Sequence, residues 1–102
     1  VSVVGALRGY PGDYSAALGK RIHGIAEAEK VTGVTILGGN IAIRDGKFYA
    51  NGGRLFEVVA RAKTIANARQ RAYEAMACIH VEGNNLHYRH DIAWQEMEQF
   101  YA

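Results

Sequence analysis

The sequence predicts an α+β fold, in which a small antiparallel sheet, built as a meander of short strands, carries two helices. Three observations support this class. Short β-branched or apolar runs occupy residues 1–61, with glycine-rich turns between them. From residue 64 onward, apolar and alanine residues recur every three or four positions, which is the helical period. The order of strands first and helices later differs from the strand–helix alternation of a parallel sheet.

The expected strands are short and bounded by turn residues. They span residues 1–7, 34–37, 41–44, 47–50 and 54–61, and a further extended segment spans 86–89. The first run is apolar and β-branched, which is typical of a strand buried on both faces. Asp45-Gly46 predicts a tight hairpin turn. Asn51-Gly52-Gly53 predicts a second turn, with glycines that adopt positive φ.

Two helices follow the strands. Thr64 is expected to cap the first, because its hydroxyl can accept a hydrogen bond from a free backbone amide. The apolar face of this helix is formed by Ile65, Ala68, Ala72, Ala75 and Ile79. Residues 26–30 are expected to form a short helical turn. Asp91 is expected to cap a last helix that directs Trp94, Met97 and Phe100 or Tyr101 inward.

The composition indicates one globular domain and excludes several classes of protein. The 102 residues include 12 Lys and Arg and 10 Asp and Glu, interleaved along the chain, so no basic face for a nucleic acid is expected. There is no apolar run long enough for a membrane span. The single cysteine, Cys78, allows no internal disulfide, and a cytoplasmic location is expected. Because the chain starts at Val1 inside an expected strand, we expect it to be a piece of a larger protein.

The best candidate for chemistry is the turn Asn51-Gly52-Gly53 with the Arg54 that follows it. An Arg beside a glycine-rich turn can bind a phosphate or carboxylate, and the turn amides can assist. Lys47, on the preceding strand, is a weaker candidate for the same anion. Turn chemistry alone also explains this motif and is the simpler interpretation of the bare residues. The two interpretations are compatible.

The other candidates for chemistry are better explained as structure. The run from Gly12 to Arg21 has the wrong glycine spacing for a phosphate-binding Walker loop and lacks its Ser or Thr. His87 and His90 have no further ligands at metal-site spacing, so no metal is expected. Cys78 is expected to be a buried structural thiol. The sequence contains no arrangement typical of a catalytic triad, and we assign no catalytic residue.

Four sequence elements, in this order, carry a resemblance that covers nearly the whole chain. They are Gly9-Tyr10-Pro11-Gly12-Asp13-Tyr14, Asn51-Gly52-Gly53-Arg54, Arg71-Ala72-Tyr73 and Arg89-His90-Asp91-Ile92. In this arrangement the chain resembles the C-terminal domain of the phosphoribosylamine–glycine ligase family. The chain departs from the family pattern at three positions. Leu37 stands where the family has a histidine, Glu57 stands where the family has a small or apolar residue, and Ala62 stands where the family has a glycine.

The resemblance implies a fold and a function. The family consists of ATP-grasp ligases of purine biosynthesis, and its C-terminal domain is similar to the barrel-sandwich-like domain of biotin carboxylase. The parent enzyme joins glycine to 5-phosphoribosylamine, with ATP and magnesium bound in domains upstream of this one. Residues 1–102 would then be a single C-terminal domain, inactive in isolation, whose partners are those missing domains and 5-phosphoribosylamine. Arg54, Gly52, Gly53 and Lys47 would hold the substrate phosphate. The alternative is a standalone module that binds an anion or a protein, with residues 51–54 serving as a turn only.

Overall fold

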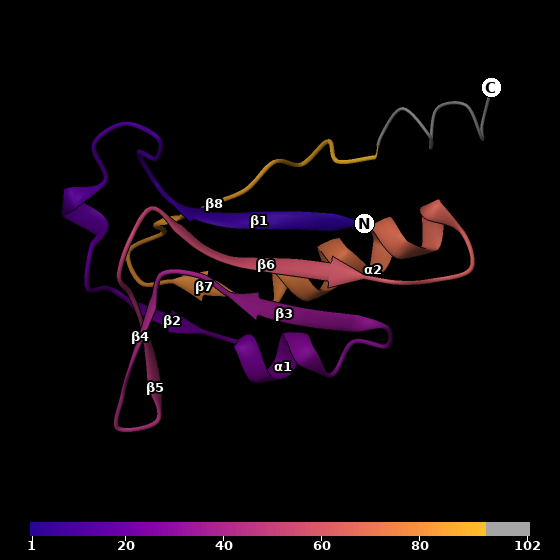
Figure 1. Ribbon diagram of the computed structural model, residues 1–102, viewed down its shortest axis with the longest axis horizontal. Coiled ribbons are helices and arrows are strands. Elements are labelled where there is room, and N and C mark those ends of the chain that lie inside the picture. The colour runs from indigo at the N-terminus through magenta and orange to yellow at the C-terminus, as the bar shows by residue number, and fades with distance from the viewer. Residues whose placement is uncertain (94–102) are drawn as a thin grey trace.

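The computed structural model describes residues 1–93, and within them the chain forms eight strands and two α-helices (Figure 1). The strands are β1 (Ser2–Leu7), β2 (Arg21–His23), β3 (Val34–Gly38), β4 (Ile41–Arg44), β5 (Lys47–Ala50), β6 (Arg54–Ala60), β7 (His80–Val81) and β8 (Leu86–His87). The helices are α1 (Ile25–Glu29) and α2 (Ile65–Ala77), and Ser15–Ala17 forms a 3-10 turn. The expected last helix lies outside the described residues, apart from its first positions.

The strands form two four-stranded antiparallel sheets, so the α+β class is confirmed but the single meander is wrong. One sheet has the order β3-β6-β1-β8 and the other has the order β4-β5-β2-β7. Strand β3 pairs with β6 rather than with β4, the next strand in sequence. The hairpin β4–β5 belongs to the second sheet, where β5 pairs with β2. Figure 1 shows this hairpin projecting from the body of the molecule.

The turn between β4 and β5 has the conformation that the sequence predicts. Asp45 and Gly46 both adopt positive φ, at 50° and 73°. This pair of left-handed residues suits a two-residue hairpin, because its twist matches that of the flanking strands. Arg44 and Lys47 face each other across the turn.

The helix α2 begins as predicted and ends slightly earlier. The Thr64 hydroxyl accepts a hydrogen bond from the Asn67 amide at 3.1 Å, which confirms the cap. Ala68, Ala72 and Ala75 are buried, and the helix packs against β6, β1 and β3. Ile65 differs from the expectation, because its side chain is 49% exposed at the first turn.

The core lies between the first sheet and α2 and continues into the second sheet. Its largest fully buried side chains are Leu7, Leu55, Met76, Val3, Val58 and Val81. Strand β1 is less buried than expected, because Ser2 is exposed and Val4 is half-buried. None of the described helices is both long and apolar enough to span a membrane.

Candidate functional site

Arg54 is the first residue of β6, and its backbone is fixed by contacts on both sides. Its carbonyl accepts two hydrogen bonds from Asn40, one from the backbone amide at 3.1 Å and one from Nδ2 at 3.0 Å. On the other side Arg54 pairs with Ala6 of β1, directly after an irregularity in the register. The exposed side chain therefore starts from a well-defined point of the sheet.

Arg54 lines an open cleft of about 150 Å³ on the first sheet. The cleft residues are Val4, Leu37, Gly38, Gly39, Arg54, Phe56 and Glu57. The walls thus combine apolar side chains with one cation and one carboxylate. The Glu57 carboxylate accepts a hydrogen bond from the Ser2 hydroxyl of the neighbouring strand β1. Gly39 lets the β3–β4 connection approach β6, since an added Cβ would lie 3.0 Å from the Leu55 carbonyl oxygen.

The glycines of the turn before Arg54 do not play the predicted conformational role. Neither Gly52 nor Gly53 has a positive φ, so that expectation is wrong. They permit close approach instead. A Cβ on Gly53 would lie 2.1 Å from Cδ2 of the Tyr10 ring, and one on Gly52 would lie 2.6 Å from Cβ of Asn40. The motif therefore joins three segments that are distant in sequence.

The amides of this turn have free donor capacity. The Gly53 carbonyl accepts from the Leu7 amide at 2.7 Å, and the Asn51 amide donates to the Asn40 carbonyl at 2.9 Å. Within residues 1–93, the amides of Gly52 and Gly53 donate no hydrogen bond. Two backbone donors thus lie directly before the Arg54 guanidinium in the chain, as an anion-binding turn would require.

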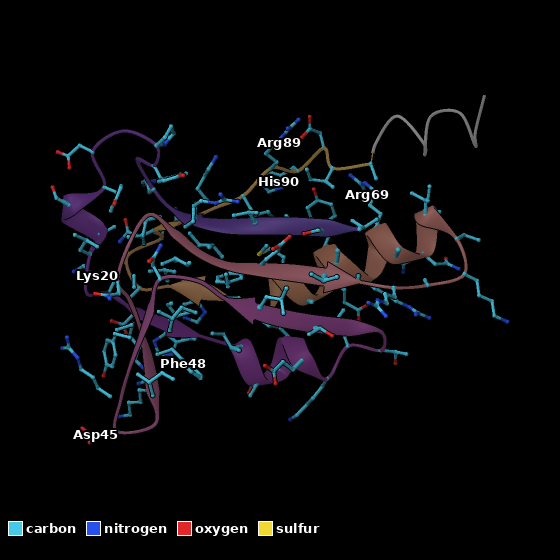
Figure 2. The ribbon with its side chains drawn as sticks, in the orientation of Figure 1. Lys20, Asp45, Phe48, Arg69, Arg89 and His90 are labelled. Atoms are coloured by element: carbon cyan, nitrogen blue, oxygen red, sulfur yellow. The ribbon has the colours of Figure 1, made fainter. Side chains whose placement is uncertain are left out.

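The structure does not bring Lys47 to this cleft. Lys47 lies beside the tip of the β4–β5 hairpin, opposite Arg44 and in the second sheet. Figure 2 labels Asp45 at that tip, at the far end of the projecting hairpin. The three residue steps from Lys47 to Ala50 alone span about 10 Å along an extended strand. Arg54 therefore lines the cleft, its chain neighbours Gly52 and Gly53 are not among the cleft residues, and Lys47 is separate from all three.

A second group of polar contacts, which the sequence did not predict, ties the segment after β8 to α2. The guanidinium of Arg69 donates to the carbonyls of Ile92 and His90, both at 2.9 Å. It also lies over the Tyr73 ring, 4.8 Å from the centroid. The Tyr73 hydroxyl donates to the Arg89 carbonyl at 2.6 Å and accepts from the Ile92 amide at 3.1 Å. Figure 2 shows Arg69, Arg89 and His90 along the upper side of the molecule, above β1.

These contacts show that Tyr73 does more than pack, because its hydroxyl joins α2 to the segment after β8. The signal available in the sequence was the spacing of Arg69 and Tyr73, four residues apart and therefore on one face of α2, together with Arg89 and Asp91 downstream. Arg89 donates two hydrogen bonds to the Asp91 carboxylate, at 3.0 and 2.9 Å. These bonds hold the pKa of Asp91 below its usual value and raise the pKa of Arg89.

The histidines and the cysteine take part in local contacts. His23 and His80 stack with ring centroids 4.7 Å apart, and Nε2 of His23 lies 2.8 Å from a carboxylate oxygen of Glu82. This hydrogen bond lowers the pKa of Glu82. Cys78 is half-buried, and its thiol lies 3.5 Å from the Glu74 carbonyl. In the described part of the chain, no three His, Cys, Asp or Glu side chains gather as a metal ion would need.

Comparison with known proteins shows the family to which the chain belongs. The family model described as "Phosphoribosylglycinamide synthetase, C domain" matches residues 1–95. The chain belongs to this C-domain family. It is 37% identical over 99 residues to the phosphoribosylamine–glycine ligase of Brucella melitensis, a match that covers 97% of this chain and 22% of that protein. It is also 38% identical over 95 residues to the trifunctional purine biosynthetic protein adenosine-3 of Bos taurus, covering 93% of this chain and 9% of that protein.

A solved structure supports the fold of this C domain. The crystal structure of phosphoribosylamine–glycine ligase from Thermotoga maritima matches with a TM-score of 0.66 and 34% sequence identity. The match covers 88% of this chain and 20% of that one. The C domain therefore spans about a fifth of the length of the ligases that it matches.

Proposed function

We propose that this chain serves as the C-terminal domain of a phosphoribosylamine–glycine ligase and holds the phosphate of 5-phosphoribosylamine. The observation that carries the proposal is the exposed Arg54 that lines the cleft, in a chain that belongs to this family, with the amides of Gly52 and Gly53 preceding it in the chain. A guanidinium suits a phosphate, because its fork of N–H donors matches two phosphate oxygens. The amides add neutral donors at the same point.

The rest of the reaction belongs to the parent enzyme. ATP and magnesium would be bound outside this chain, and glycine would be activated there as an acyl phosphate. The amine of 5-phosphoribosylamine would then attack that acyl phosphate, and phosphate would leave. This chain contributes binding rather than acid–base chemistry, so its isolated form is expected to have no ligase activity. The parent enzyme is expected to work in the cytoplasm, in purine biosynthesis.

Steady-state kinetics of the full-length ligase test the role of Arg54. The Arg54→Gln variant removes a charge-assisted contact, which is worth about 1.5–3 kcal/mol, or about 10- to 150-fold in binding. We expect the KM for 5-phosphoribosylamine to rise by that factor, while the KM for ATP stays unchanged. Arg44→Gln is the matched control, because Arg44 is exposed on the β4–β5 hairpin and lies outside the cleft.

The same variants test the alternative, a module in which residues 51–54 act as a turn only. The close approach of Tyr10 to Gly53 and of Asn40 to Gly52 would account for both glycines without a ligand. If Arg54→Gln shifts the KM for ATP, or affects no KM more than Arg44→Gln does, the phosphate role of Arg54 is wrong. Ligase turnover by the 102-residue chain alone would contradict the division of labour between this domain and the rest of the enzyme.

A further inference from the structure

A second pocket lies at the opposite end of β6 from Arg54, and its only charged lining residues are cations. It is open, with a volume of about 430 Å³, and its lining residues are Arg61, Ala62, Lys63, Asn67 and Arg71. Arg61 and Lys63 lie in the connection from β6 to α2, and the other two polar residues lie one turn apart on α2. Seven residue steps, or about 23 Å along an extended strand, separate Arg61 from Arg54. This pocket is therefore distinct from the cleft at Arg54.

Packing fixes one of the three cations and leaves the other two to solvent. Nη1 of Arg71 donates to the Arg61 carbonyl at 2.9 Å, and the Arg61 amide donates to the Gly33 carbonyl at 2.9 Å. An added Cβ on Gly33 would lie 2.9 Å from Nη1 of Arg71 and closer still to the Arg61 carbonyl oxygen, so the three segments meet closely. Arg71 is accordingly half-buried and held in place, whereas Arg61 and Lys63 are exposed.

The charge of this cluster is not neutralised by the part of the chain that the structure describes. Within residues 1–93, no carboxylate lies within 4.0 Å of the cationic groups of Arg61, Lys63 and Arg71. In the same range, Arg71 donates only the bond to Arg61 and the Asn67 side-chain amide donates none. Charges of one sign around a concave surface focus the field and raise the local concentration of anions. An anion here would meet three cations and spare N–H donors, without an opposing carboxylate.

We propose that this pocket is a second anion site, which binds a linear oligophosphate, either free or as the phosphate tail of a nucleotide. The inference goes beyond the proposed function and does not depend on the role of Arg54. The guanidinium forks of Arg61 and Arg71 each match a pair of phosphate oxygens, and the Lys63 ammonium adds a compact point charge. An oligophosphate carries several negative charges along one short chain, so separate cations can contact it at once. The volume lies within the roughly 300–1,000 Å³ of small-molecule pockets.

NMR titration of the 102-residue chain, whose core forms within residues 1–93, tests this site with tripolyphosphate, ATP, citrate and inorganic phosphate in the absence of divalent cations. The amide signals of Arg61, Lys63 and Asn67 are expected to shift together. Tripolyphosphate should bind at least about tenfold more tightly than phosphate, the size of one charge-assisted contact. Citrate, whose carboxylates branch from one short skeleton, should bind more weakly than tripolyphosphate. ATP binding at least as tight as that of tripolyphosphate would assign a nucleotide as the source, and weaker binding would assign a free oligophosphate.

Matched variants separate this site from the overall charge of the chain. Arg61→Gln and Lys63→Gln each remove one cation of the pocket, while the hydrogen bond from Arg71 to the backbone of residue 61 can remain. Each should weaken tripolyphosphate binding about tenfold. Arg44→Gln removes the same charge from the β4–β5 hairpin, outside the pocket, and should leave the affinity unchanged.

Three results would overturn the proposal. If Arg44→Gln weakens binding as much as Arg61→Gln and Lys63→Gln do, the chain attracts anions only through its overall charge. If the shifts are confined to residues 52–54, the anion binds at Arg54 and not in this pocket. If citrate binds as tightly as tripolyphosphate, or tripolyphosphate does not bind, the assignment of an oligophosphate is wrong.

Discussion

Replacing Gly53 with alanine should destabilise the fold through a single steric conflict. The new Cβ would lie 2.1 Å from Cδ2, 2.7 Å from Cε2 and 3.0 Å from Cγ of Tyr10. These atoms belong to the near edge of the ring, so the whole ring must move. Overpacking of this kind costs about 1–3 kcal/mol. Since the φ of Gly53 is not positive, alanine also gains about 0.4–1 kcal/mol by restricting the unfolded chain. The net loss is therefore at most about 2.6 kcal/mol, and the loss relative to a glycine-to-alanine change without a steric conflict is about 1–3 kcal/mol.

Thermal denaturation followed by circular dichroism measures this loss. For a chain of this size, a loss of about 1–3 kcal/mol relative to a matched glycine-to-alanine control corresponds to a Tm lower by roughly 4–24 °C. Gly38→Ala is the matched control, because an added Cβ there meets no atom within 4 Å and the φ of Gly38 is ordinary. The double variant Tyr10→Ala, Gly53→Ala should lose less than the sum of the single changes. If Gly53→Ala is as stable as Gly38→Ala, close approach does not explain this glycine.

Two further predictions concern contacts outside the cleft. Tyr73→Phe removes a donor to the Arg89 carbonyl and an acceptor for the Ile92 amide, so it should cost about 1–3 kcal/mol and accelerate hydrogen exchange at Ile92. Unchanged exchange there would show that the hydroxyl does not hold this segment. Glu82→Gln should flatten the acid dependence of stability, because the hydrogen bond from His23 lowers the pKa of Glu82 in the folded state. Because the pKa is lowered in the folded state, ionised Glu82 stabilises the fold above the usual pKa of about 4.5. This stabilisation is lost as the pH falls through the pKa of the folded state. If stability falls equally steeply with acid in Glu82→Gln and in the wild type, the prediction is wrong.

Features that depend on neighbouring residues could be predicted from the sequence. Asp45-Gly46 encodes its own turn, because Asn, Asp and Gly tolerate positive φ. Thr64 encodes its own cap, because its hydroxyl reaches an amide three residues later. Both outcomes depend on contacts within one turn of chain. The α+β class follows from the same local patterns.

Features that depend on distant residues could not be predicted in this way. Strand β2 has three residues, too few for a periodic pattern, and it exists because β5 and β7 pair with it. The meander failed for a related reason, since the sequence does not show that β3 pairs with β6 across the inserted hairpin. That insertion also separates Lys47 from Arg54, although they are seven positions apart in the chain.

The turn before Arg54 shows how a local explanation can identify the right residues for the wrong reason. Glycine-rich turns are usually explained by positive φ, yet here Gly53 and Gly52 are needed because Tyr10 and Asn40 approach them. Asn40 also donates twice to the Arg54 carbonyl, so the packing that requires the glycines fixes the start of β6. The turn and the candidate phosphate site are therefore one structure. Perturbing the packing should affect stability and ligand position together, whereas Arg54→Gln should affect the ligand alone.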